Sequence, residues 1–161
     1  MKNITMTKIV LYNHPAKWGR HRLSGAVVTL IDGAGNPMGS HTLGDMTTIA
    51  MIQLSLSDFT LSAFVAQTLK TLPARTIKVQ STEENAVTLA EVELYDQSDV
   101  NQALGKPSTQ SNTWMERDAS LAVDGDTQTF SNTFKRTGES KNSLFAVWAL
   151  HSFITSKTVY R

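Results

Sequence analysis

Short stretches in which apolar and polar residues alternate recur along the chain, and no long stretch has the spacing of an amphipathic helix. The alternation is clearest in residues 75–80 and 89–95. A period of two indicates strands that bury one face. The β-branched runs at 8–12 and 25–31 and the aromatic run at 144–150 are also typical of strands. The pattern therefore predicts an all-β protein.

Residues 32–39 concentrate Gly, Pro, Asn and Asp, so we expect a chain reversal here that leads into a strand at 40–43. Alternation predicts a further strand at 52–56, and a short helical turn is expected at 120–123. The last residues, 153–161, repeat the Ile, Thr and Val character of the first strand. A repeat one domain length apart is typical of a piece of a tandem array.

The chain has 161 residues and a net charge of +1, which suits one domain and gives no basic block for a nucleic acid partner. There is no cysteine, so disulfides and thiolate metal sites are excluded. The apolar runs fall short of a membrane span, and the N-terminal residues lack the apolar core of a signal peptide. No nucleophile motif or zinc-site histidine spacing occurs, so we do not expect an enzyme.

Several segments resemble the F-type lectin (fucolectin, tachylectin-4-like) branch of the galactose-binding-like superfamily, which includes the discoidin and coagulation factor 5/8 type C domains. Their order is swapped, because residues 1–96 resemble the closing part of a domain and residues 97–161 the opening part of the next. The resemblance implies an antiparallel jelly-roll β-sandwich, either circularly permuted or made of two half-domains. The segments that carry it are 11–15, 22–28, 89–95, 103–111 and 119–127.

The resemblance also implies a structural calcium ion, held around the Val-Asp-Gly-Asp loop at 123–126 and by a Glu of a closing strand. Calcium takes roughly six to eight oxygen ligands, and carbonyl, carboxylate and hydroxyl oxygens are all suitable. A metal-free turn at this loop is the alternative. The expected ligands are the Leu121 carbonyl and the side chains of Asp124, Asp126, Thr129 and Glu91.

A sugar site is implied at the loops of one end, where the family carries a His and an Arg-x-Asp-x4-Arg pattern. Arg22 keeps a matching position, and Asn132 stands where the family has its histidine. His14 lies in the Asn-His-Pro-Ala segment that replaces the family's Asn-Arg pair and its Asp. The lost Asp removes an acceptor, so we expect a degenerate fucose site. Trp18 and Trp114 are candidates to stack on a sugar.

The sequence therefore predicts a non-enzymatic, lectin-like module that binds fucosylated or galactosylated glycans. By family implication it would belong to a larger extracellular or cell-surface protein and contact neighbouring repeats. The alternative is a structural or adhesion repeat that binds no sugar, or a fragment of a tandem array.

Overall fold

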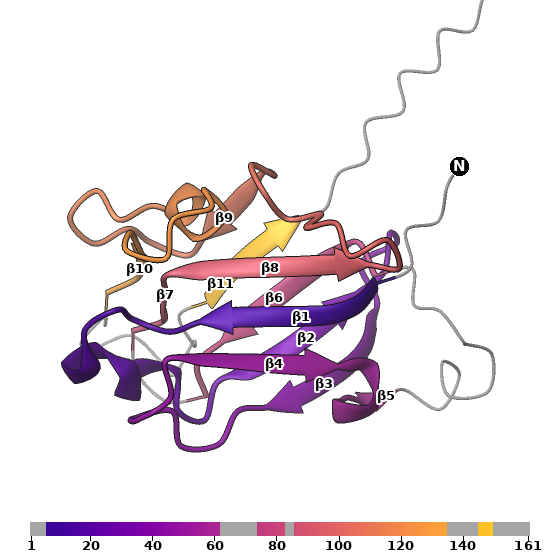
Figure 1. Cartoon of the computed structure of the whole chain (residues 1–161), viewed down its shortest axis with the longest axis horizontal. Coiled ribbons are helices and arrows are strands. Elements are labelled where there is room, and N and C mark those ends of the chain that lie inside the picture. Colours follow the sequence, from indigo (N-terminus) through magenta and orange to yellow (C-terminus); the bar gives the residue numbers. More distant parts are fainter. Residues whose placement is uncertain (1–5, 62–73, 83–85, 135–144, 150–161) are drawn as a thin grey trace, which may run out of the picture.

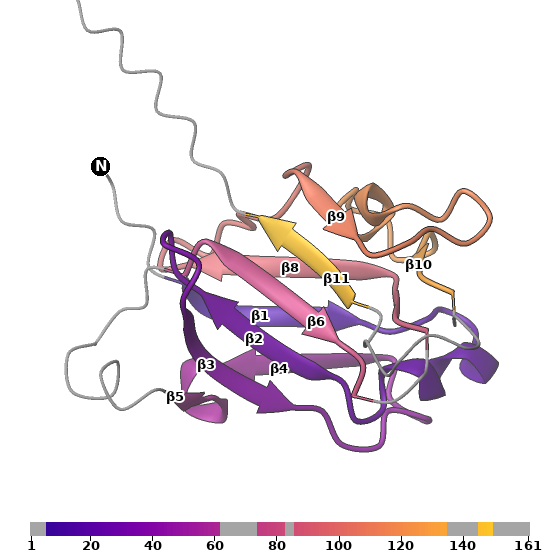
Figure 2. The ribbon, with the colours of Figure 1, turned by 180° about the vertical axis from the view of Figure 1, so that it is seen from behind.

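A computed structural model describes residues 6–61, 74–82, 86–134 and the backbone of 145–149. These residues form an antiparallel β-sandwich, in which a three-stranded sheet lies over a six-stranded sheet (Figures 1 and 2). The predicted all-β sandwich is confirmed. Among the described residues, no helix is both long and apolar enough to cross a membrane.

The three-stranded sheet has β1 in its centre, and the strands in spatial order are β4 (Met51–Ser55), β1 (Met6–Tyr12) and β8 (Glu91–Asp96). The six-stranded sheet comprises β5 (Thr60–Leu61), β3 (Pro37–Thr42), β2 (Val27–Ile31), β6 (Thr76–Gln80), β11 (Phe145–Ala149) and β9 (Ser108–Gln110). A separate pair joins β10 (Ser131–Asn132) to β7 (Thr88–Leu89). Three short 3-10 helices connect the strands: η1 (Lys17–Leu23), η2 (Leu56–Asp58) and η3 (Ala119–Ala122).

Strands from both of the predicted sections pair within the same sheets. β11 lies between β6 and β9, and β10 pairs with β7. The core includes Ala103, Ala122 and Val123 from the later section, packed with apolar residues of the earlier strands. The early and late parts of the chain are therefore joined by both backbone pairing and side-chain packing.

The alternating patterns have the expected physical basis, because β2 and β6 bury every second residue. Most predicted strands are observed within two or three residues of the expected ends, and the turn at 120–123 is η3. The strand predicted at 25–31 begins later because Gly25 has a positive φ of 70° and leaves the extended conformation. The stretch at 89–95 is interrupted at Ala90, whose amide donates to the Tyr12 carbonyl. Residues 153–161 lie outside the described part of the chain.

Candidate functional site

The loop that leaves β1 is organised by Asn13, which is buried. Its Nδ2 donates to the carbonyl oxygens of Arg20, Met46 and Ile49 at 3.0, 3.1 and 3.0 Å, and its Oδ1 accepts from the His14 amide at 2.8 Å. One side-chain amide thus serves both as donor and as acceptor. Asn13 ties η1 to the loop that precedes β4 and so fixes the backbone on which the candidate glycan residues stand.

The His14 ring is buried at one end of the sandwich, and only 2% of the residue is exposed. It packs between Trp18 and Phe130, with ring centroids 4.6 and 4.4 Å away. A Cβ at Gly19 would come within 2.4 Å of the ring, so only glycine leaves room for it at that position. The histidine is therefore held by packing on several sides.

Both hydrogen-bonding contacts of the His14 ring are made by Nδ1. It lies 3.0 Å from the Ala16 amide, which can only donate, and 3.0 Å from the Ala16 carbonyl, which can only accept, so either neutral tautomer makes one bond to Ala16. Burial lowers the pKa of His14, and the nearby Arg22, Arg117 and Arg20 lower it further, although the backbone bond to Ala16 acts in the opposite direction. Nε2 is buried and has no partner among the described residues. His14 therefore presents a neutral ring whose Nε2 is unused.

Arg22 reaches from η1 to the pair formed by β7 and β10. Its Nη1 donates to Thr88 Oγ1 at 3.3 Å and to Asn132 Oδ1 at 3.4 Å, and the Thr88 hydroxyl donates to the same Asn132 oxygen at 2.7 Å. Burial lowers the pKa of Arg22. Its guanidinium carbon also lies 5.5 Å from the centre of the Trp18 ring. The structure therefore brings Arg22 together with His14 and Asn132, which lie 8 and 110 positions away from it in the sequence.

Arg117 and Phe130 complete the cluster, and neither was predicted from the sequence. The Arg117 guanidinium stacks over Phe130 at 4.3 Å, and the Asn132 amide donates to the Arg117 carbonyl at 2.9 Å. Gln110 Nε2 donates to the carbonyls of both Arg117 and Asn132. A spacing argument cannot find this arginine, because its position depends on a pairing between the 110–117 loop and β10.

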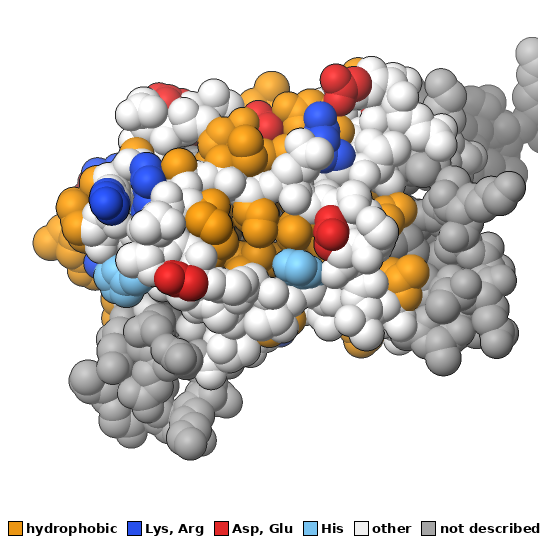
Figure 3. All heavy atoms as spheres, turned by 60° about the horizontal axis from the view of Figure 1, so that its bottom comes forward, with side chains coloured by type: hydrophobic (Ala, Val, Ile, Leu, Met, Phe, Trp, Pro, Cys, Tyr) orange, Lys and Arg blue, Asp and Glu red, His pale blue; other side chains and the backbone are white. Residues whose placement is uncertain are grey.

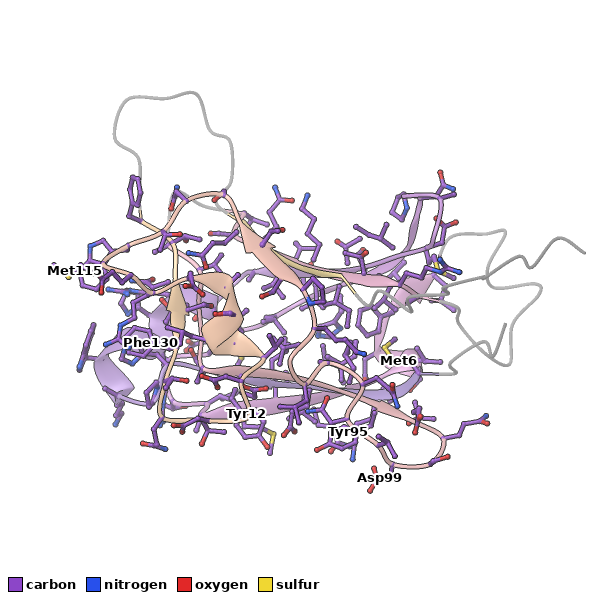
Figure 4. All side chains as sticks on the ribbon, turned by 90° about the horizontal axis from the view of Figure 1, so that it is seen from above. Met6, Tyr12, Tyr95, Asp99, Met115 and Phe130 are labelled. Carbon is purple, nitrogen blue, oxygen red and sulfur yellow. The ribbon has the colours of Figure 1, made fainter. Side chains whose placement is uncertain are left out.

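The rim of the cluster is apolar and exposed. Trp18 is 67% exposed and Met115 is 72% exposed, and Trp114 is also on the surface. Met115 and Glu116 have φ values of 47° and 59°, an uncommon conformation for residues with side chains. Figure 4 shows Met115 and Phe130 at one end of the molecule, with Asp99 toward the other. Exposed aromatic residues and a strained loop at one end are features of a binding surface.

Glu91, the first residue of β8, is the buried member of the candidate calcium site, with only 1% of the residue exposed. Its Oε2 accepts from the Gly125 amide at 3.2 Å, and its Oε1 is buried with no partner among the described residues. Burial raises the pKa of Glu91 to about 7; the Gly125 bond opposes this, while the charges of Asp124 and Glu93 add to it. This carboxyl group therefore lacks the stabilisation that its ionised form needs.

The loop beside Glu91 is rich in oxygen. Thr129 Oγ1 lies 3.3 Å from the Leu121 carbonyl, 2.9 Å from Asp124 Oδ2 and 2.9 Å from the Asp126 carbonyl. One hydroxyl hydrogen can serve only one of these three acceptors at a time. The Asp126 carbonyl thus joins this cluster, and the Oδ1 of the Asp126 carboxylate accepts from the Gln128 amide.

These oxygens are of the kinds that calcium binds. No group of three or more His, Cys, Asp or Glu residues suited to a metal occurs in the described ranges, so a cation here would depend on carbonyl and hydroxyl oxygens as well as on Glu91 and Asp124. Calcium accepts such mixed oxygen ligands in a flexible loop, and Gly125 has the positive φ of 85° that this turn requires. A bound cation would also neutralise the unpartnered Glu91 oxygen.

The two clusters share one segment of chain. Thr129 belongs to the oxygen cluster, Phe130 packs on His14, and Asn132 accepts from Arg22. A cation that orders Thr129 would therefore also restrict the residues that face the glycan candidates.

Comparisons of the chain with family models, with curated proteins and with solved structures found no match.

Proposed function

We propose that the chain is a non-enzymatic, lectin-like module that binds carbohydrate at the Arg22, His14 and Asn132 cluster and holds a structural calcium ion beside Glu91. One observation carries this proposal: three residues singled out by resemblance to a sugar-binding family lie in one cluster beneath the exposed Trp18. Sugar recognition combines side-chain hydrogen bonds with an aromatic face on which the ring stacks, and this cluster contains both.

In this proposal the finer fold is the galactose-binding-like jelly roll, and the module belongs to a larger extracellular or cell-surface protein. Arg22 is the main donor to sugar hydroxyls, because it is half-buried and has nitrogens beyond the one that contacts Thr88 and Asn132. His14 contributes its unpartnered Nε2, and Asn132 holds Arg22 in position. Calcium keeps the 121–129 loop and the following residues ordered.

A spacer module that binds no ligand is the second candidate, and one observation favours it. Arg22, Thr88 and Asn132 already hydrogen-bond one another, as residues with a purely structural role do.

Binding to a panel of immobilised glycans, in the presence of calcium, tests the proposal. We expect saturable binding by the natural chain, weakened at least about tenfold by Arg22→Ala, because a lost charged hydrogen bond costs about 1.5 to 3 kcal/mol. The matched control is Arg75→Ala, which removes an exposed arginine beside Gly33 in the β2–β3 hairpin and should bind normally. No binding to any glycan of the panel would favour the spacer module. Normal binding by Arg22→Ala would place any sugar site elsewhere.

A further inference from the structure

Positive charge dominates the proposed glycan site. The charges of Arg22, Arg117 and Arg20 each lower the pKa of His14, so all three guanidinium groups lie near its ring. Within the described ranges, the one ion pair at 4.0 Å or less joins Lys8 to Asp99, and Figure 4 places Asp99 far from Phe130. The three guanidinium groups therefore have no carboxylate partner in the described part of the chain. Figure 3 shows Lys and Arg side chains gathered with hydrophobic ones at one end of the molecule.

The three arginines differ in how much of their hydrogen-bonding capacity is used. Arg20 donates to the carbonyls of His14, Pro15 and Thr48, so it serves the loop itself. Arg22 uses a single nitrogen. Arg117 stacks on Phe130 and has no side-chain hydrogen bond to the described residues. A guanidinium has about five N–H donors in a planar fork, so Arg22 and Arg117 keep most of theirs available.

The arginines give this site more free side-chain donors than free side-chain acceptors. A neutral sugar hydroxyl both donates and accepts, and lectin sites usually offer it groups of both kinds. Here the Asn132 Oδ1 acceptor is already taken by Thr88 and Arg22, and Gln110 Oε1 is unpartnered but buried, whereas Arg22 and Arg117 keep several free N–H donors. A surface that offers donors and positive charge favours a ligand that brings negatively charged oxygens.

Resting on the proposed function, we infer that this site selects acidic saccharides, which carry a carboxylate or a sulfate group, over their neutral counterparts. Arg22 and Arg117 bind the acidic group through their free N–H donors, and the exposed Trp18 stacks on the sugar ring. Arg20 contributes its charge but not its donors.

The test compares three forms of one disaccharide by calorimetry: lactose, lactose with one sulfate, and lactose with a terminal sialic acid. We expect at least one acidic form to bind about tenfold or more tightly than lactose, since a charge-assisted bond is about twice as strong as a neutral one. Raising the salt from about 50 mM to about 200 mM should weaken that binding, because mobile ions screen the pairing. Which acidic form binds identifies the source of the charge.

Arg22→Gln and Arg117→Gln should each remove most of the preference for the acidic form, whereas Arg75→Gln should keep it. A thermal unfolding scan of each variant confirms that it is folded, and Arg117→Lys should retain part of the preference because the charge remains. Equal binding of lactose and its acidic forms would overturn this inference and leave the proposed function standing. Inorganic sulfate binding as tightly as sulfated lactose would also overturn it, because the site would then be an anion site only. No binding of any saccharide would overturn both.

Discussion

Replacing Glu91 with glutamine is expected to have opposite effects on stability with and without calcium. In chelator at about pH 8, we expect Glu91→Gln to raise the free energy of unfolding by about 1 to 3 kcal/mol, because a neutral amide avoids the cost of a buried charge. In calcium, the natural chain should be the more stable of the two, since it gains about 4.1 kcal/mol at a calcium concentration of about 1,000 times Kd. The glutamine variant loses the charged ligand and should gain much less.

The pH dependence of stability provides a second test of the role of Glu91. The pKa of Glu91 is raised from 4.5 to about 7 in the folded chain, so the folded state holds more protons than the unfolded state between these values. The stability of the calcium-free protein should therefore fall as the pH rises from about 4.5 to about 7 and then level off. Glu91→Gln should lack this dependence.

Urea unfolding at several pH values, with calcium and with chelator, measures both effects. Glu93→Gln is the matched control, since Glu93 lies on the same strand but accepts from the Tyr95 hydroxyl and is only half-buried. It should keep the calcium response. A Glu91→Gln variant that is destabilised in chelator as well as in calcium would contradict the cation site.

The second large effect is expected at Asn13. In Asn13→Asp, an oxygen replaces the Nδ2 donor and faces the carbonyl oxygens of Arg20, Met46 and Ile49. The two Nδ2 hydrogens that these three carbonyls share are lost, and a buried carboxyl group is left beside three acceptors. We therefore expect the free energy of unfolding to fall by about 3 to 5 kcal/mol, or the chain to fail to fold. Thermal unfolding measures it.

Asn101 offers a control of the same chemistry. It uses only its Oδ1, which accepts from the amides of Leu94 and Ala103 at 3.1 and 3.0 Å. An aspartate keeps that acceptor, so Asn101→Asp should change the free energy of unfolding by about 1 kcal/mol or less. Similar losses for the two variants would mean that the Nδ2 bonds of Asn13 do not hold the loop.

The strands were predictable because burial on one face imposes alternation, as Val28 and Leu30 of β2 and Ile77 and Val79 of β6 illustrate. The hairpin turn followed from its concentration of turn-forming residues. η1 was missed because Lys17–Leu23 is a 3-10 helix, too short for a helical period to emerge.

The structure brings Arg22 to Asn132 and Glu91 to the Asp124 loop, but the residues that support these contacts were not predictable. Glu91 and the Asp124 loop meet only because β8 begins beside η3, and no local sequence pattern predicts that contact. In the sequence, Asn13 is indistinguishable from other polar loop residues, because its four hydrogen-bonding contacts exist only in the folded chain. Phe130 packs on a histidine from the other end of the chain, which depends on tertiary contacts alone.

We propose that saccharide binds at the end of the sandwich formed by η1 and β10. The most direct measurement is a nuclear magnetic resonance titration of the labelled, calcium-loaded chain with the tightest-binding saccharide. We predict concentration-dependent shifts of the Trp18 indole N–H, of the Arg22 side chain and of the amides at 130–133, while the amides of the 32–39 turn stay unchanged. Saturable shifts confined to another surface, or no shifts up to millimolar saccharide, would contradict saccharide binding at this end of the sandwich.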